Sequence, residues 1–288
     1  MTKQKATIVV EVNKSCNIKC NFCYLEQDNT YLSYSDLINN ITRGLQKADE
    51  LYDIQEIRIS GGEPSLMLVD TYNTVLRICK RYTNNIIVET NLVGIQDFII
   101  DSPVKIVVGF DNNARPQNTQ QYINMAKMPR EFDMQIVSTP YLQAFTPNYL
   151  IKKFSRELPN LKNVYIKRYE PYIHKVFNVS DEKHEFMVKN FLTSPLEKTF
   201  HLLNEDEMDK FMDPAYIPND VVYIEYPTGN LMKKIHDVYR STTTTSKMKA
   251  VRYVSIDDER EEYRYIPTQE MIDWYKNSYK THKYTVGV

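Results

Sequence analysis

Three cysteines lie within eight positions of one another in the stretch CNIKCNFCY, and the chain has only four cysteines in all. Their spacing, Cys16-x3-Cys20-x2-Cys23, places three thiols in one short segment. The amino-terminal residues show no signal-peptide pattern, so we expect a compartment in which thiols stay reduced. Clustered cysteines there are more often metal ligands than disulfide partners. The spacing therefore predicts a metal centre.

The number of cysteines limits which type of metal centre the motif can form. Structural zinc normally takes four thiolate or imidazole ligands, and four-iron clusters usually take four thiolates. Here the next cysteine is Cys79 and the first histidine is His174, both far along the chain. Three thiolates leave one coordination position open, and an open position is where a metal centre does chemistry. The count predicts a catalytic iron–sulfur cluster with one exchangeable ligand.

A pair of adjacent glycines, Gly61 and Gly62, is the second unusual feature. The chain has only 7 glycines, and this pair occurs in the stretch SGGEP, directly after an apolar run typical of a strand. Because glycine permits backbone conformations and close approaches that other residues do not, the pair indicates a special backbone site.

Strand and helix patterns alternate through the first part of the chain, which predicts a parallel sheet with right-handed helical crossovers. Six such alternations are too few for a complete eight-unit barrel. In parallel sheets of this kind, functional residues gather at the carboxyl ends of the strands. The expected strands are 8–12, 54–60, 85–89, 104–108, 134–137 and 164–167, and the expected helices are 35–51, 69–82, a short one from 96, 119–128 and 148–158.

The pattern changes after about residue 172. A hairpin is expected around the turn 227–230, followed by a polar loop at 241–246 and a strand at 251–256. Further helices are expected at 180–192, 205–212 and 269–279. We interpret residues 1–172 as the barrel core and 173–288 as an α+β extension that covers the barrel opening.

The cysteine motif, with Phe22 just before the last cysteine and Tyr24 just after it, together with SGGEP at the end of the second strand, resembles the radical S-adenosylmethionine (radical SAM) enzymes. The resemblance covers roughly residues 5 to 172. It implies an α/β fold, a partial (β/α)6 parallel barrel, and two cofactors, one [4Fe–4S] cluster and S-adenosylmethionine. It also implies that the three cysteines are the catalytic cluster ligands, Cys16, Cys20 and Cys23.

The resemblance further implies a set of residues that contact the cofactors. The glycine pair would let backbone approach the methionine amino group, and Glu63 would accept a hydrogen bond from that group. The other strand ends have competing explanations: a strand-end cap, a surface ion pair or simple packing. The residues that the resemblance places at the cofactors are Phe22, Gly61, Gly62, Glu63, Pro64, Asn91, Asp111, Ser138 and Arg168.

The form of the cysteine motif is similar to that of sulfatase-maturing enzymes and peptide maturases. Those relatives carry further cysteines for auxiliary clusters, whereas this chain has no cysteine after Cys79, which we interpret as a buried core residue. We therefore expect an oxidoreductase with a single cluster that abstracts a hydrogen atom from a peptide or protein side chain. The alternatives are radical chemistry on a nucleotide or other small molecule, and a non-catalytic iron–sulfur or zinc-binding module.

Composition restricts the partners. The chain is 42% hydrophobic and 25% charged, with a formal net charge of −1, as expected of a globular domain. This near-zero net charge does not favour electrostatic binding to nucleic acid or to an anionic membrane. No apolar run is long enough to span a bilayer, so we expect a cytoplasmic protein. The resemblance implies a reductant such as flavodoxin or ferredoxin as a partner.

Overall fold

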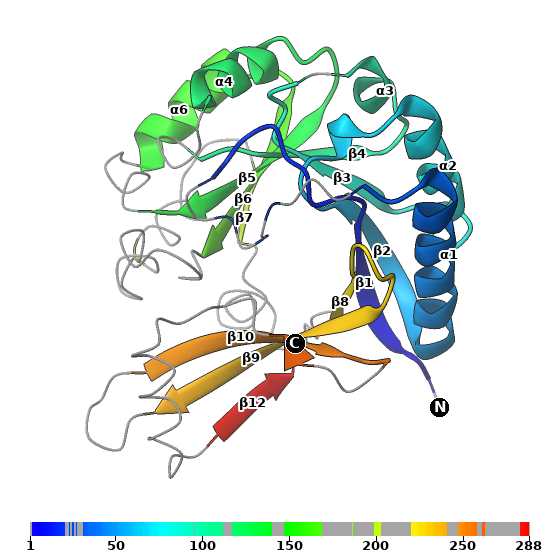
Figure 1. Ribbon diagram of the computed structural model, residues 1–288. Helices are drawn as coiled ribbons and strands as arrows, with labels where there is room; N and C mark the ends of the chain where they lie inside the picture. The colour runs from blue at the N-terminus through cyan, green and yellow to red at the C-terminus, as the bar shows by residue number, and fades with distance from the viewer. Residues whose placement is uncertain are drawn as a thin grey trace.

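The protein folds around one mixed sheet, which is seen here in a computed structural model (Figure 1). The structure describes residues 2–20, 23, 25, 27, 31–94, 96–111, 117–139, 147–168, 186, 199–202, 220–240, 247–257, 261–262 and 283–287. The strands are β1 Gln4–Glu11, β2 Tyr52–Ser60, β3 Ile86–Thr90, β4 Lys105–Gly109, β5 Phe132–Ser138, β6 Leu161–Arg168, β7 Thr199–Leu202, β8 Asp220–Ile224, β9 Leu231–Arg240, β10 Lys247–Ser255, β11 Glu261–Glu262 and β12 Lys283–Gly287.

The strand order is β11-β10-β9-β8-β1-β2-β3-β4-β5-β6-β7, and β12 pairs with β9. Strands β1 to β7 follow one another in sequence order and are parallel, which confirms the predicted α/β barrel arrangement. Two features were not expected. Strand β7 extends the parallel series beyond the sixth strand, and β8 pairs in parallel with the opposite edge of β1.

Helices connect the parallel strands and cover the outer face of the curved sheet (Figure 1). They are α1 Tyr34–Leu51, the 3-10 helix η1 Pro64–Leu66, α2 Val69–Cys79, α3 Asp97–Ile100, α4 Asn118–Ala126 and α6 Pro147–Glu157. All the helices expected before residue 172 are confirmed, with small shifts of their ends. Those expected at 180–192, 205–212 and 269–279 lie outside the described residues, except that Phe186 is helical.

Helix α1 illustrates why these segments fold as they do. Its buried positions Leu37, Ile41, Leu45 and Ala48 recur with helical spacing and face the sheet. The hydroxyl of Ser33 accepts a hydrogen bond from the Asp36 amide at 3.1 Å and so caps the N-terminus of the helix. Its residues join those of β1, β2 and α2 in one hydrophobic core between the sheet and the helices.

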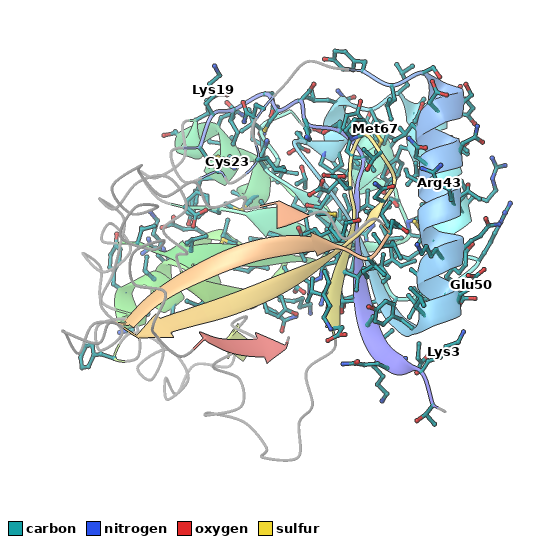
Figure 2. All side chains as sticks on the ribbon, turned by 60° about the horizontal axis from the view of Figure 1, so that its bottom comes forward. Lys3, Lys19, Cys23, Arg43, Glu50 and Met67 are labelled. Carbon is teal, nitrogen blue, oxygen red and sulfur yellow. The ribbon has the colours of Figure 1, made fainter. Side chains whose placement is uncertain are left out.

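The carboxyl ends of the parallel strands and the residues after β1 lie at the same end of the sheet. In Figure 2, Lys19, Cys23 and Met67 mark this end, whereas Lys3 and Glu50 mark the opposite one. The fold thus brings the two sequence motifs to one edge. No helix among the described residues is long and apolar enough to cross a membrane.

The expected hairpin is formed by β8 and β9, which pair antiparallel. Its turn packs on α1: Asn40 Nδ2 donates to the Pro227 carbonyl at 2.6 Å, and an Arg43 guanidinium nitrogen donates to the Thr228 carbonyl at 2.6 Å. Gly229 has a positive φ of 74°, and a Cβ there would lie 2.7 Å from the Asn40 Cβ. The extension is therefore joined to the first strand and to the first helix of the barrel.

Candidate radical SAM site

The cysteine loop, which we define as residues 12–23, is held to the SGGEP segment by backbone hydrogen bonds. Val12 N donates to the Ser60 carbonyl at 2.9 Å, so the loop starts as a continuation of the β1–β2 pairing. Gly62 N then donates to the Asn13 carbonyl at 2.8 Å, and Glu63 N donates to the Ser15 carbonyl at 2.9 Å. Cys16 follows directly. Its position is therefore set by the second strand as well as by the first.

The glycine pair is required by this close contact. A Cβ on Gly61 would lie 2.5 Å from the Asn13 carbonyl oxygen, and Gly61 has a φ of 129°. A Cβ on Gly62 would lie 2.0 Å from the Ser15 carbonyl oxygen. The predicted special backbone site is confirmed, and the backbone that the glycines approach in this structure is that of the cysteine loop.

Asn13 completes the contact and was missed in the sequence. Its Oδ1 accepts from the amides of Gly62 and Glu63, both at 3.1 Å, while its Nδ2 donates to the Glu63 carbonyl at 3.0 Å. The side chain is buried. The position of Asn13, a polar residue between a buried strand and the first cysteine, could have indicated its role.

The carboxylate of Glu63 is 1% exposed and bonds to the next strand end. Its Oε1 accepts from the Thr90 hydroxyl at 2.6 Å and from Ser65 N at 3.0 Å, and its Oε2 accepts from Asn91 N at 2.7 Å. Burial raises the pKa of Glu63, while the hydrogen bonds from Asn91, Thr90 and Ser65 act in the opposite direction. Pro64 opens η1, where its missing amide costs no helical hydrogen bond.

The three predicted cluster ligands are half-buried in the loop. Cys23 N donates to the Cys20 carbonyl at 3.1 Å, which closes a turn between these two residues. Burial raises the pKa of the Cys16 thiol; a hydrogen bond from the Ile18 backbone lowers it, and negative charge on Glu63 and Cys23 raises it further.

The donor set of the cysteine loop bears on which metal centre it could hold. Structural zinc normally takes four protein ligands, whereas each thiolate of an iron–sulfur cluster binds a different iron. Three thiols, with no further cysteine or histidine nearby in the sequence, fit a [4Fe–4S] cluster with one open iron.

Asn91 lies at the centre of the site. Its Nδ2 donates to Asn17 Oδ1 at 2.7 Å and lies 3.5 Å from Cys16 Sγ, within hydrogen-bonding reach of sulfur. Its carbonyl accepts from Gln121 Nε2 at 2.5 Å. Gln121 is fully buried and also donates to the Gly109 carbonyl at 3.1 Å, so it links the ends of β3 and β4. Gln121 was not expected from the sequence to be part of the site, although it shares helical spacing with the buried Met125.

Three further predicted residues, Asp111, Ser138 and Arg168, lie at the same edge of the sheet. Asp111 is buried, and its Oδ1 accepts from the amide of Val137 in β5. Ser138 and Arg168 are the last residues of β5 and β6 and pair in register. The predicted roles of their side chains, and the whole of Phe22, lie outside the described residues. Cys79, in contrast, is fully buried in α2, where burial raises the pKa of its thiol to about 12, which confirms it as a core residue.

Comparison with known proteins agrees with this geometry. Residues 10–106 match the family model of the Radical SAM superfamily. The fold is similar to that of Streptococcus suis SuiB bound to S-adenosylmethionine, with a TM-score of 0.58 over 80% of this chain and 60% of that chain at 13% identity. SuiB bound to the precursor peptide SuiA gives a TM-score of 0.57 over 80% and 59% of the two chains, also at 13% identity.

Two further structures share the fold. anSMEcpe with bound AdoMet and the Cp18Cys peptide has a TM-score of 0.51 over 65% of this chain and 59% of that chain at 15% identity. A radical SAM methyltransferase from Sphaerobacter thermophilus has a TM-score of 0.51 over 69% and 66% of the two chains at 16% identity. The matched region covers about 60% of the SuiB chain. No curated protein matches the sequence significantly.

The cysteine loop and the segment that holds it both fall inside the region matched by the family model, on a fold shared with radical SAM enzymes. Residues 10–106 therefore match the radical SAM family model, and this match implies S-adenosylmethionine and a [4Fe–4S] cluster as cofactors.

Proposed function

We propose that this protein is a radical SAM enzyme with a single cluster and that its substrate is a peptide or protein side chain. A cluster bound at the three cysteines would supply the electron for reductive cleavage of S-adenosylmethionine into methionine and a 5′-deoxyadenosyl radical, which would abstract a hydrogen atom from the substrate and become 5′-deoxyadenosine. The observation that carries the proposal is the cysteine loop, which is fixed at the carboxyl ends of the parallel strands by the Gly62 and Glu63 amides.

The residues of the chain have distinct tasks in this proposal. Cys16, Cys20 and Cys23 would hold three irons of the cluster, and the fourth iron would be left for the cofactor. Glu63 is a buried carboxylate beside the cysteine loop, and Thr90, Ser65 and Asn91 donate hydrogen bonds to it. An ammonium group, such as the amino group of the cofactor, would be attracted to its negative charge. The buried polar side chains around this carboxylate would also exclude water from the reaction.

The peptide assignment has three supports. The cysteine motif resembles the peptide-maturase type, and the structures of similar fold include SuiB bound to its precursor peptide and anSMEcpe with the Cp18Cys peptide. The β8–β9 hairpin, whose turn is fixed to α1 by Asn40 and Arg43, also resembles the hairpin that opens the extension of peptide maturases. Chemistry on a nucleotide or small molecule is the second candidate, because the four cysteines leave no ligands for an auxiliary cluster.

The proposed reaction also requires a one-electron reductant. A flavodoxin or a ferredoxin would supply it, and both are found where thiols stay reduced. We infer the cytoplasm as the location on the same ground, since the three loop cysteines must remain thiolates to bind iron.

The test is cofactor cleavage under anaerobic conditions. The protein is reconstituted with iron and sulfide, mixed with S-adenosylmethionine and dithionite, and assayed for 5′-deoxyadenosine. We expect product from the parent and none from Cys20→Ala. Cys79→Ala is the matched control, because it also removes one cysteine but lies in the core of α2 and should keep both cluster and activity.

The substrate class is then tested by adding peptides or nucleotides and measuring the rate of 5′-deoxyadenosine formation. Acceleration by peptides alone supports the proposal, and acceleration by nucleotides alone favours the second candidate. Tightly bound zinc, with no iron cluster formed under any condition, would contradict the enzyme assignment.

A further inference from the structure

The side-chain amide of Asn91 points its nitrogen at a predicted cluster ligand. Its Nδ2 carries two hydrogens and has two acceptors within reach, Asn17 Oδ1 at 2.7 Å and Cys16 Sγ at 3.5 Å. The oxygen of the same amide accepts from the backbone N–H of Val93 at 2.8 Å. Since a backbone amide can only donate, this bond requires the oxygen to face Val93 and the nitrogen to face the sulfur.

The backbone of Asn91 is held from two further sides. Its N–H donates to Glu63 Oε2 at 2.7 Å, and its carbonyl accepts from Gln121 Nε2 at 2.5 Å. The residue is 5% exposed, so water does not compete strongly for these bonds. An amide fixed in this way keeps one N–H directed at Cys16 without a further loss of side-chain entropy.

We propose that Asn91 is a positioning residue that donates an N–H···S hydrogen bond to Cys16 in the cluster-bound enzyme and thereby raises the reduction potential of the cluster. The inference rests on the proposed cluster at the three cysteines. A hydrogen bond to a ligand sulfur stabilises the extra negative charge of the reduced cluster, so it favours reduction. Electron entry is then easier for the physiological reductant than it is in a protein without this donor.

The experiment compares the reduction potentials of reconstituted proteins by anaerobic titration, with the reduced cluster followed by electron paramagnetic resonance. The test variants are Asn91→Ala, which removes the donor, and Asn91→Asp, which replaces it with a charged acceptor of the same shape. The matched control is Asn124→Ala. Asn124 is also a buried asparagine that braces this loop, but its Nδ2 donates to the carbonyls of Leu92 and Val93, at 2.8 and 3.2 Å, and not to sulfur.

We expect Asn91→Ala to bind the cluster and to be reduced with an equilibrium constant about tenfold lower, a potential about 59 mV more negative for one electron. Asn91→Asp should shift further in the same direction, and Asn124→Ala should keep the parent potential. Parent potentials in both Asn91 variants would overturn the inference, as would an equal shift in Asn124→Ala, since the effect would then come from loop stability alone.

A measurement on the parent keeps the test decisive if the Asn91 variants do not bind the cluster. Parent protein labelled with ¹⁵N in its asparagine side-chain amides should show coupling between the reduced cluster and a labelled nitrogen. Absence of such coupling overturns the inference while the parent cluster remains intact. Failure of the parent itself to form a cluster would instead refute the proposed function.

Discussion

Replacement of Gly62 by alanine should detach the cysteine loop from the strand end that holds it. The new Cβ would lie 2.0 Å from the Ser15 carbonyl oxygen, 2.5 Å from the Ser15 carbonyl carbon and 2.8 Å from the Lys14 carbonyl carbon. All three atoms belong to the backbone, so no side-chain rotation relieves the overlap. The loop must move away by more than an ångström before these contacts become ordinary.

The cost of this movement follows from the bonds that it breaks. Gly62 and Glu63 donate to the carbonyls of Asn13 and Ser15 and to Asn13 Oδ1. Loss of two such bonds costs about 1–3 kcal/mol, and overpacking of a tight contact costs a further 1–3 kcal/mol or so. We therefore expect Gly62→Ala to lower the free energy of unfolding by about 2–6 kcal/mol and to reduce the iron bound per chain after reconstitution.

The assay is urea unfolding of the metal-free protein without oxygen, together with iron and sulfide analysis after reconstitution. The control is Gly94→Ala, because a Cβ at Gly94 would meet only the Asn17 side-chain nitrogen, at 3.4 Å. We expect the control to unfold near the parent midpoint with an unchanged urea dependence. If Gly62→Ala has both the parent midpoint and the parent iron content, the cysteine loop is not held by its backbone contact with Gly62.

Three further predictions concern the same structure. Glu63→Gln replaces one of the two acceptor oxygens with an NH2 donor, so the bonds from Asn91 and from Thr90 and Ser65 cannot all be kept, and it should cost about 1–3 kcal/mol in urea unfolding at pH 7. Because burial raises the pKa of Glu63, the parent loses stability as pH rises above the ordinary carboxyl range, and the variant should not show this loss. Parallel pH profiles of the two proteins would contradict this. Gly229→Ala places a Cβ 2.7 Å from the Asn40 Cβ at a positive φ and should cost about 1–3 kcal/mol, a loss that a parent-like urea midpoint would rule out. Cys79, whose pKa is raised to about 12, should resist iodoacetamide at pH 8 until the metal-free protein unfolds, whereas the loop cysteines react first; early labelling of Cys79 by mass spectrometry would show that α2 opens.

Much of the barrel was predictable because its signals are local. The apolar positions of α1 repeat with helical spacing and start at a capping serine, Ser33, so its bounds differed from expectation by one residue. The three cysteines and the glycine pair were also visible as rare residue types at defined spacing. These features depend on neighbours in the sequence, and a single chain is sufficient to find them.

The partners of these residues were less predictable because they depend on contacts between distant segments. The sequence indicated that Gly61 and Gly62 permit a close approach, but not that the approaching backbone is Asn13 to Ser15. Asn13 and Gln121 are ordinary polar residues whose importance comes from the carbonyls and amides around them. The pairing of β8 with β1 leaves no periodic signal either, since it depends on which edge of the sheet is vacant.

That pairing has a consequence for how the protein is made. Ala6 in β1 lies beside Asp220 in β8. One edge of β1 therefore stays unpaired during synthesis until more than 200 further residues have been added. At synthesis rates of about 5–20 residues per second, this delay is about 10–40 s. During that time an apolar strand edge is open to other nascent chains, as in any unprotected edge strand. Late closure of this edge would make the protein dependent on chaperones during translation and would make chains that end before β8 prone to aggregation.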